Sequence, residues 1–301
     1  MKIAVLLTCF NRRQKTVSCL ASLGTAYKNY NENNKEGRQL KIEIYLTDDG
    51  SSDGTADAAR SIVDYAPLHI LQGSGSLYWA GGMRFCWKEA MKRNNEWDFY
   101  LLLNDDTDLL SCAFSELLST HVYSLNQTGK AGIYSGITCS KSNPKQLTYG
   151  GDVWVNHFLG TMRRLDKTDV PQRCDMTNAN ILLVPKEVVN RIGIFYEKYQ
   201  HDNADSDYSN YANKKGVPVW VTAGYCGVCD YDHPNRAKQA EIVCAMSLKE
   251  RKEYFKNPVH SSKDYIIYRS RVTPFRLPLV LLGRLLNLYW PKLYYKIDKV
   301  R

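Results

Sequence analysis

The chain has 301 residues, of which 44% are hydrophobic and 24% are charged. This length fits one large domain or two, and it suffices to bury a substantial core without disulfides or structural metals. The 21 Tyr and 6 Trp residues exclude a largely disordered chain. The 9 cysteines are odd in number and scattered, so we expect free thiols in a reducing, cytoplasmic compartment rather than a disulfide framework.

The net charge of +9 lies mainly in the C-terminal tail. Residues 263–301 contain nine Lys or Arg and two Asp, so the rest of the chain carries a charge of only +2. A nucleic-acid-binding groove would draw basic residues from the folded body as well. The charge distribution therefore argues against a nucleic-acid partner.

The N-terminal residues do not have the pattern of a targeting segment. The apolar run Ile3–Leu7 is short, Asn11-Arg12-Arg13 follows it, and no small-residue cleavage site is present. We expect a buried first strand instead. Because the sequence contains no run of about 18 uncharged apolar residues, no membrane-spanning helix is expected.

Short apolar runs alternate with amphipathic stretches through the first 140 residues. This alternation predicts a mostly parallel sheet with helices on both faces. The expected strands are Ile3–Thr8, Ile42–Thr47, Leu68–Leu71, Phe99–Leu103 and Ala131–Ile137. The expected helices are Gln14–Leu23, Asp53–Val63, Gly81–Asn94 and Cys112–Leu125. Polar runs follow three of the strands, and loops at the carboxyl ends of parallel strands form a ligand crevice, so we expect these runs at one edge.

The pattern changes after about residue 145. Alternating polar and apolar residues predict a hairpin, and a glycine at position 216 favours the end of a helix. The expected elements are hairpin strands at Leu147–Val155 and Phe158–Arg164, a strand at Ile181–Val184, a helix starting at Pro185 and a helix over Asp205–Lys215. Residues 231–262 are polar and irregular, and they predict a flexible loop.

The most apolar part of the tail is Leu277–Trp290, which Pro278, Gly283 and Arg284 interrupt. Basic residues flank it, and aromatic residues lie at its end. Two interpretations remain open. The segment is an interfacial helix on an anionic membrane, or it is a C-terminal helix packed on the body with a solvated basic face.

Adjacent acidic residues follow the expected strand Phe99–Leu103, in the run Asn104-Asp105-Asp106. Two carboxylates at a buried strand end repel each other and lose hydration, and a divalent cation relieves both costs. Oxygen ligands suit Mg²⁺ or Mn²⁺ shared with a diphosphate. The same residues could instead form a turn that caps the next helix.

A second acidic run, Asp48-Asp49-Gly50-Ser51-Ser52-Asp53-Gly54-Thr55, follows the second expected strand. Carboxylates in this place could accept hydrogen bonds from a nucleobase or a ribose. The alternative is a simple helix start, with Ser52 or Asp53 as the cap.

In combination, these runs resemble the nucleotide-sugar domain of the inverting family 2 glycosyltransferases, which have the GT-A fold. The matching runs are Thr8-Cys9-Phe10-Asn11-Arg12, Asp48-Asp49-Gly50-Ser51 and Asn104-Asp105-Asp106, and residues 73–84 are similar to the donor loop of the rhamnosyltransferase-like branch. The resemblance covers residues 2–225. It implies a Rossmann-like, mixed α/β sheet with a nucleotide-sugar-binding part at 1–140, an acceptor-side catalytic part at 141–262 and a basic amphipathic tail at 263–301.

The resemblance also implies the donor and the cofactor, a UDP- or dTDP-sugar and a divalent cation (Mn²⁺ or Mg²⁺). Asp48 would bind the base and Asp106 the cation. Asp105 would bind either the cation or the ribose, because Asn104 occupies the first position of the family's usual Asp-x-Asp. The remaining implied donor residues are Thr8, Phe10, Asn11, Arg12, Asp49, Trp79, Gly82 and Arg84. His233 or His260 could supply a further metal ligand.

The second half contains a similar match on the acceptor side. The run from His201 to Asp207 is similar to the family's Glu-Asp-x-Asp motif, with Ala204 in place of the Glu. Asp205 would then be the general base that deprotonates the acceptor hydroxyl, and Asn178, Asn180, His201 and Asp207 would line the acceptor site. Without the resemblance, acids at a helix start are better explained as partners of the helix dipole.

The sequence thus predicts a metal-dependent inverting glycosyltransferase of surface polysaccharide synthesis, acting on a glycan or lipid-linked acceptor at the inner membrane face. One alternative is a sugar-phosphate nucleotidyltransferase, although Thr8–Arg13 lacks the glycine-rich loop that such enzymes have after strand one. Another is a non-catalytic glycan- or nucleotide-binding protein, consistent with the departures at Asn104 and Ala204. The single Cys226-Gly-Val-Cys229 motif has no second pair, and it predicts no zinc site.

Overall fold

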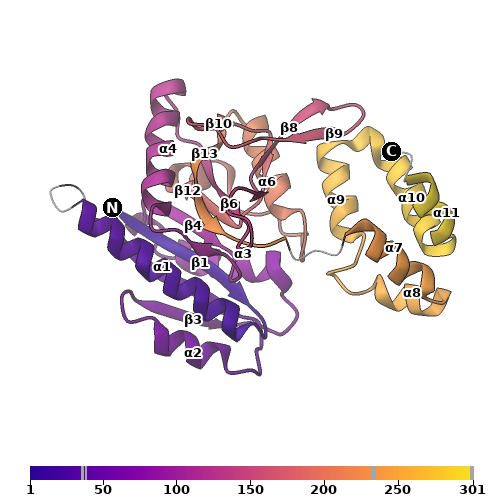
Figure 1. Ribbon diagram of the computed structural model, residues 1–301, viewed down its shortest axis with the longest axis horizontal. Coiled ribbons are helices and arrows are strands. Elements are labelled where there is room, and N and C mark those ends of the chain that lie inside the picture. The colour runs from indigo at the N-terminus through magenta and orange to yellow at the C-terminus, as the bar shows by residue number, and fades with distance from the viewer. Residues whose placement is uncertain (35–36, 38, 232–234, 299–301) are drawn as a thin grey trace.

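The computed structural model describes residues 1–34, 37, 39–231 and 235–298 (Figure 1). The strands are β1 (Lys2–Cys9), β2 (Lys41–Asp48), β3 (Leu68–Gln72), β4 (Phe99–Leu103), β5 (Asp108–Leu109), β6 (Ile133–Cys139), β7 (Leu147–Tyr149), β8 (Gly151–Asn156), β9 (Thr161–Arg164), β10 (Gln172–Arg173), β11 (Met176–Thr177), β12 (Ile181–Pro185) and β13 (Val219–Val228). The helices are α1 (Arg13–Asn33), α2 (Thr55–Ile62), α3 (Tyr78–Met91), α4 (Ala113–Thr128), α5 (Lys186–Ile192), α6 (Ala204–Lys214), α7 (Arg236–Ala245), α8 (Leu248–Tyr254), α9 (Lys263–Val272), α10 (Leu277–Tyr289) and α11 (Pro291–Asp298), with 3₁₀ turns at Asn94–Glu96 and Pro274–Arg276.

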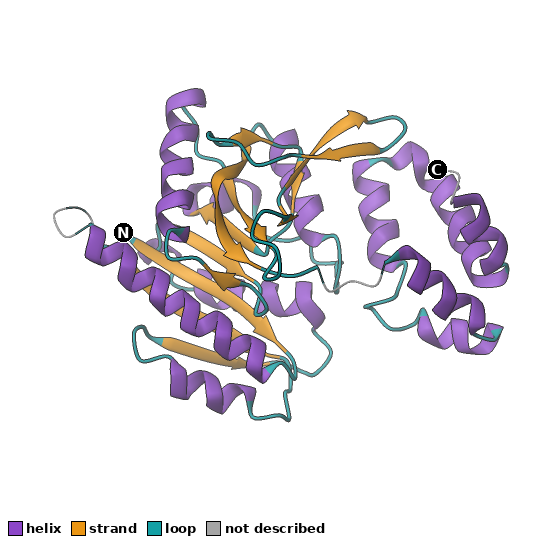
Figure 2. Ribbon diagram, in the orientation of Figure 1, coloured by secondary structure: helices purple, strands orange, loops and turns teal. Residues whose placement is uncertain are grey.

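A ten-stranded mixed sheet forms the centre of the molecule (Figure 2). Its main path is β10-β13-β6-β12-β4-β1-β2-β3, with β5 beside β13 and β7 beside β6. Strands β3, β2, β1 and β4 are parallel, whereas β12 is antiparallel to its neighbours β4 and β6. Because of this reversal, the first residues of β12 lie beside the carboxyl end of β4. The predicted α/β sheet flanked by helices is confirmed.

The two faces of the sheet carry separate hydrophobic cores. On one face, Ile3, Val5 and Leu7 of β1 pack with residues of α1, α2 and α4. On the other face, Ala4 and Leu6 pack with residues of α3, α5, α6 and α9. A strand that is covered on both sides needs apolar side chains at successive positions, and this explains the continuous apolar run of β1.

Most expected elements of the first half occur within a few residues of their predicted bounds, and β4 coincides with its prediction. The longest strand that the sequence analysis did not predict is β13, which pairs with β6 in the body of the sheet. Its β-branched residues Val219, Val221 and Thr222 are typical of a strand, so the signal was present in the sequence. The expected hairpin at 147–164 is confirmed for β8 and β9, while β7 separates from it and pairs with β6.

The prediction of a flexible loop over residues 231–262 is wrong, because most of this segment forms helices α7 and α8. Each begins with a side-chain cap: Asn235 accepts from the Lys238 N–H, and Ser247 forms a reciprocal capping box with Glu250. In α7 only Val243 is buried, and in α8 only Arg251. Helices that bury so little have no apolar stripe, so their periodicity is weak in the sequence.

The tail continues as α9, α10 and α11, which with α7 and α8 form a helical lobe beside the sheet (Figure 1). Helix α9 contacts α6 of the main body, and α10 packs on α8, α9 and α11. Among the described residues, no helix combines the length and the hydropathy needed to cross a bilayer. None of the 9 cysteines forms a disulfide in the described structure.

Candidate active site

The parallel strands β1, β2 and β4 end at one edge of the sheet, as the sequence predicts. Cys9 at the end of β1 pairs with Asp48 at the end of β2, and Leu6 pairs with Leu102 of β4. The loops after these strands are tied together. The Asn11 side chain accepts the Ser52 N–H at 2.8 Å, and the Asn11 N–H donates to the Ser51 hydroxyl at 2.9 Å. The three predicted polar runs therefore form one continuous rim.

Arg12 joins the two acids that follow β4. Its guanidinium lies 3.1 Å from Asp105 Oδ1 and 2.5 Å from Asp106 Oδ2. Asp105 is buried and also accepts a hydrogen bond from the Thr16 hydroxyl at 3.2 Å. Burial raises the pKa of Asp105 to about 7, with Arg12 opposing this effect and the charge of Asp106 adding to it. The Asp106 side chain remains 23% exposed, so of the two carboxylates it is the more accessible.

Asp49 organises the expected donor loop. Its two oxygens accept the backbone N–H groups of Gly75, Leu77 and Tyr78 at 2.8–3.0 Å. Tyr78 has a positive φ of 55°, an uncommon backbone conformation for a residue other than glycine. The buried Asp48 accepts the Ser51 N–H at 2.9 Å. The Asp49 carboxylate is thus committed to backbone groups, and its contact with the donor stays a prediction.

The residue that departs from the family pattern, Asn104, has a local partner. Its side-chain oxygen accepts the indole N–H of Trp79 at 2.8 Å. The Trp79 ring lies 5.6 Å from that of Phe195, and Phe195 is buried in the core. Asn104 therefore fixes the indole at the start of α3 beside the rim.

Residues 178–180 connect this rim to the predicted base. The Asn104 N–H donates to the Asn180 carbonyl at 3.0 Å, and the Asn180 side-chain amide lies 3.5 Å from the Cys229 sulfur. The same thiol lies 4.0 Å from Asp106 Oδ1. One residue earlier, the Ala179 N–H donates to Asp205 Oδ2 at 2.9 Å. Asp106 and Asp205 therefore lie on the same side of the molecule.

Asp205 is held at the start of α6 and is only partly buried. Its second oxygen accepts the Ser206 N–H at 2.8 Å. Burial raises the pKa of Asp205 to about 6, and the charge of Asp202 adds to this effect, while the N–H groups of Ser206 and Ala179 oppose it. A carboxylate with a pKa near neutrality and a fixed orientation is suited to accept a proton.

Other predicted residues make contacts within the protein or lie exposed on the rim. The Asp207 carboxylate pairs with Arg271 of α9 at 2.8 Å, so it faces the helical lobe. Arg84 donates to the Tyr196 carbonyl at 3.3 Å. Gly82 packs so closely on β1 that an added Cβ would collide with the Thr8 side chain, which gives both residues a packing role. Phe10 is exposed on the rim.

The acceptor-side residues meet the donor loop. The His201 ring lies edge-on to that of Tyr78, with centroids 6.2 Å apart. The Gly81 N–H donates to the Gln200 carbonyl at 3.3 Å. The side-chain oxygen of Asn178 is shielded from solvent and has no hydrogen-bond partner among the described residues. An orphaned acceptor of this kind is expected where a ligand completes the hydrogen bonding.

Asp264 of α9 is a site residue that sequence reasoning missed. This buried carboxylate accepts the backbone N–H groups of Gln200, His201 and Asp202 at 2.6–3.2 Å. It therefore fixes the loop that leads into Asp205. The one available signal was an acid isolated in a basic tail, where only two Asp occur among nine Lys or Arg.

The described acids at the rim offer few ligands to a cation. Within the described residues, no group of three or more His, Cys, Asp or Glu side chains could hold a metal ion. His260 stacks on Tyr254 with centroids 4.0 Å apart, between α8 and α9, and His233 lies outside the described residues. Asp106 opens into a cavity of about 80 Å³ that Asp108 and Asp230 also line. Asp108 already pairs with Lys141 at 2.8 Å, which leaves Asp106 as the accessible carboxylate. A single carboxylate fits Mg²⁺ or Mn²⁺, which often takes one or two and completes its shell with substrate phosphates and water.

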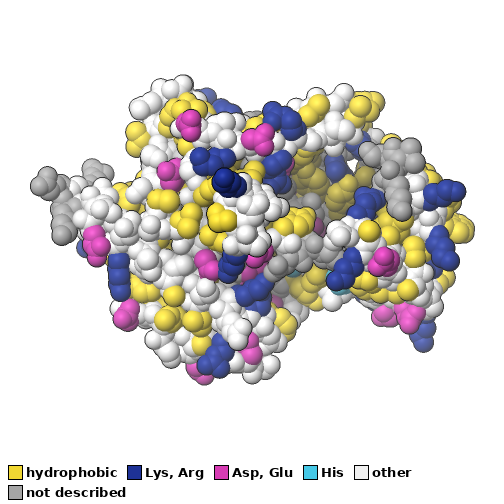
Figure 3. Space-filling model, in the orientation of Figure 1, with side chains coloured by type: hydrophobic (Ala, Val, Ile, Leu, Met, Phe, Trp, Pro, Cys, Tyr) yellow, Lys and Arg dark blue, Asp and Glu magenta, His cyan; other side chains and the backbone are white. Residues whose placement is uncertain are grey.

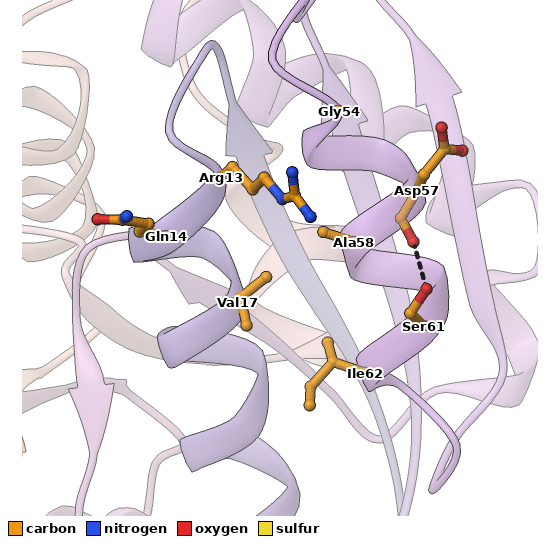
Figure 4. A pocket seen from close by; sticks show the side chains of 8 residues that line it. All are labelled: Arg13, Gln14, Val17, Gly54, Asp57, Ala58, Ser61 and Ile62. Carbon is orange, nitrogen blue, oxygen red and sulfur yellow. Dashed lines mark hydrogen bonds between the residues drawn. The ribbon is translucent and has the colours of Figure 1, made fainter.

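A cavity of about 530 Å³ lies away from these acids, between α1 and α2 (Figure 4). Val17, Ala58 and Ile62 form its wall, and Arg13 reaches across its upper end (Figure 4). Its Ser61 hydroxyl donates to the backbone carbonyl of Asp57. An open groove between two helices, without convergent polar groups, does not have the character of a catalytic site.

The mixed sheet with helices on both faces and an acidic rim has the fold of the GT-A-like glycosyltransferases. A truncated S. aureus TarS (1–349) in complex with UDP-GlcNAc has a TM-score of 0.54 at 12% identity, over 91% of this chain and 73% of that one. The same protein in complex with UDP has a TM-score of 0.52 at 12% identity, over 92% and 72%. TarS 1–349 alone has a TM-score of 0.52 at 11% identity, over 98% and 88%. No protein-family model matches the sequence, and no curated protein sequence does.

Proposed function

We propose that this chain is a metal-dependent inverting glycosyltransferase. It transfers a sugar from a UDP- or dTDP-sugar to a hydroxyl of a glycan or lipid-linked acceptor, in the cytoplasm, as part of surface polysaccharide synthesis. The carrying observation is that Asp48 and Asp106 lie at or just after strands that end at one edge of the sheet, and that Cys229 and residues 179–180 connect Asp106 to Asp205. The TarS structure with UDP-GlcNAc supports a donor of this class.

The rim supplies the groups that a nucleotide-sugar needs. Asp48 would accept hydrogen bonds from the base, while Arg12 and Asp105, which pair at 3.1 Å, would contact the ribose and the diphosphate. The unpartnered oxygen of Asn178 would accept a hydroxyl of the sugar or of the acceptor. Because Asp49 fixes the loop at residues 75–78, this loop is prepared before the donor arrives.

Asp205 would act as the general base. It takes the proton of the acceptor hydroxyl as that oxygen forms a bond to the anomeric carbon, and the bond from that carbon to the diphosphate oxygen breaks with its electron pair on the leaving group. Attack opposite to the leaving group inverts the anomeric configuration.

Asp106 is the residue best placed to hold the cation, with Asp105 as the second candidate. When bound, a divalent cation withdraws charge from the departing diphosphate. Arg12, which contacts both carboxylates, would add positive charge on the same side.

The test is a thermal-unfolding panel of UDP-, dTDP- and GDP-sugars with and without Mn²⁺, followed by an assay for nucleoside diphosphate release. We expect a UDP- or dTDP-sugar with Mn²⁺ to stabilise the fold by about 2.7 kcal/mol at about 100 times its dissociation constant. Asp106→Asn should remove the part of the stabilisation that needs Mn²⁺, whereas Asp57→Asn, an exposed change on α2, should retain it.

The products separate this proposal from its competitors. Release of nucleoside diphosphate together with a lengthened acceptor supports transfer. Binding without turnover for any acceptor would make the chain a carbohydrate- or nucleotide-binding protein. Formation of a nucleotide-sugar from a sugar phosphate and a nucleoside triphosphate would make it a nucleotidyltransferase.

A further inference from the structure

Two segments that are far apart in the sequence meet in one exposed apolar surface. The first is the tip of the β8–β9 hairpin, where Phe158 is 72% and Leu159 is 57% exposed. The Phe158 ring stacks on Phe275, just before α10, with centroids 5.3 Å apart and ring planes 5° apart. A Cβ on Gly160 would collide with the Arg276 guanidinium. The hairpin tip therefore lies directly against the start of α10 (Figure 1).

The second segment continues this surface along α10 and α11. Asn287 is the buried residue of α10, while Leu282 and Leu285 are each more than half exposed. A helix of a globular protein normally turns its leucines inward and its polar side chains outward. Here the arrangement is reversed, and exposed apolar patches of this extent mark interaction sites.

The charges beside the apolar residues have one sign. Residues 265–297 contain six Lys or Arg and no Asp or Glu. Lys292 and Lys296 are exposed on α11 and alternate with the exposed Leu293 and Ile297. Figure 3 shows hydrophobic and basic side chains next to one another on the helical lobe, which also carries acidic side chains. Tyr289 and Trp290, both exposed, lie where α10 ends, and such side chains favour the boundary between acyl chains and headgroups.

We propose that this surface, termed here the hairpin–α10 surface and defined by Phe158, Leu159, Phe275, Leu279, Leu282 and Leu285, docks on the face of an anionic lipid bilayer. The apolar side chains enter the headgroup and acyl boundary, and the neighbouring Lys and Arg meet lipid phosphates. A second copy of the chain is the poorer occupant, because two such surfaces would bring like charges together. The proposal depends on the chemistry of this surface and not on the transfer reaction.

The test is flotation of the full chain with vesicles of phosphatidylcholine alone and of phosphatidylcholine mixed with phosphatidylglycerol. We expect the protein to float with the anionic vesicles, and the bound fraction to fall as salt is raised. The double variants F158S/L159S and L282S/L285S should each lower the partition coefficient about tenfold or more, since each removes two large apolar side chains from the buried surface. The matched control V122S/V170S changes two residues that are each 53% exposed elsewhere, and it should bind as the parent does.

Three results would overturn the proposal. The first is equal flotation with neutral and anionic vesicles, or with neither. The second is unchanged binding of F158S/L159S, which would remove the hairpin from the surface. The third is a concentration-dependent dimer in sedimentation that L282S/L285S dissolves while vesicle binding is absent, which would assign the surface to a second copy. Thermal unfolding of each variant verifies that the fold is intact.

Discussion

The loops at residues 75–78 and 200–202, proposed for the donor and the acceptor, are organised in the same way but by residues from different parts of the fold. Asp49 accepts three backbone N–H groups from residues 75–78, fewer than 30 residues further along the chain. Asp264 accepts three from residues 200–202, more than 60 residues earlier. In both cases a single carboxylate accepts three backbone N–H groups of one short segment and fixes a loop beside the proposed site.

The difference lies in what positions each carboxylate. Asp49 follows β2 directly, so the sheet that carries the rim also carries this anchor. Asp264 belongs to α9, and its position depends on how the helical lobe packs on α6. The donor side is therefore built into the sheet, while the acceptor side is completed by a more distant part of the chain. The two loops meet at Tyr78 and His201.

The largest effect is expected at the proposed base itself. Asp205→Asn should lower kcat by about 10² to 10⁴, the usual contribution of a general base. Nucleotide-sugar binding should be retained, because Asp205 belongs to the acceptor side. Initial rates and a calorimetric titration with UDP-sugar measure the two quantities. An unchanged kcat in this variant would contradict the role of Asp205 as the general base.

The second prediction compares the two anchors directly. Asp264→Asn weakens the hydrogen bonds that fix residues 200–202, and we expect kcat to fall on the order of 10²-fold, as for a small displacement of a catalytic group. The KM for the donor should not change. Asp49→Asn should do the opposite and raise the donor KM about tenfold or more, since hydrogen bonds to a charged group contribute about 1.5–3 kcal/mol.

The comparison fails if both variants change the same parameter. Thermal unfolding separates positioning from a general loss of structure, and Asp264→Glu, which keeps the charge, should recover part of kcat. Recovery of kcat without a change in melting temperature would support a positioning role.

The third prediction concerns pH. Because burial raises the pKa of Asp205 to about 6, the ionised form that accepts a proton predominates above this pH. We expect kcat to be constant above about pH 7 and to fall tenfold per unit well below pH 6. A rate profile at saturating donor and acceptor measures the midpoint. A midpoint near 4, the usual range of an exposed carboxyl group, would contradict the raised pKa of Asp205.

The smallest effect concerns the packing beneath the rim. Gly82→Ala adds a Cβ that collides with the Thr8 side chain, and we expect a loss of about 1–3 kcal/mol in the free energy of unfolding. Gly283→Ala is the matched control, because its Cβ would meet only Tyr294 at 3.6 Å. This change should be neutral or slightly stabilising. Denaturant unfolding measures both.

The donor side was predictable because its residues follow the strands that position them. The apolar runs in the expected strands Ile3–Thr8 and Phe99–Leu103 placed two of the polar runs, and parallel strands bring their carboxyl ends together whatever the loops contain. The long strand β13 carried a readable signal and was still overlooked. Helices α7 and α8 leave little periodic apolar signal in the sequence, because each buries a single residue.

On the acceptor side, only the residues within the motif itself were predictable from the sequence. The sequence placed Asp205 at the start of a helix, but Asp207, two residues later, faces Arg271 of the lobe. The roles of Asp264 and Arg271 depend on contacts between segments about 60 residues apart, and no local pattern encodes such contacts. The apolar character of Leu277–Trp290 was evident from the sequence. That this segment lies against the hairpin tip is seen only in the tertiary structure.

One consequence concerns the status of the last 39 residues. Helix α9 contributes Tyr268 and Val272 to the main core and Asp264 to the loop before Asp205, so the tail is no detachable appendage. Cutting the chain at residue 262 would expose that core and release that loop. A truncated protein would then lose activity for structural reasons, and an effect of lost membrane attachment could not be measured separately. Point substitutions on the outer side of α10 avoid this, because they leave the inner side of the lobe as it is.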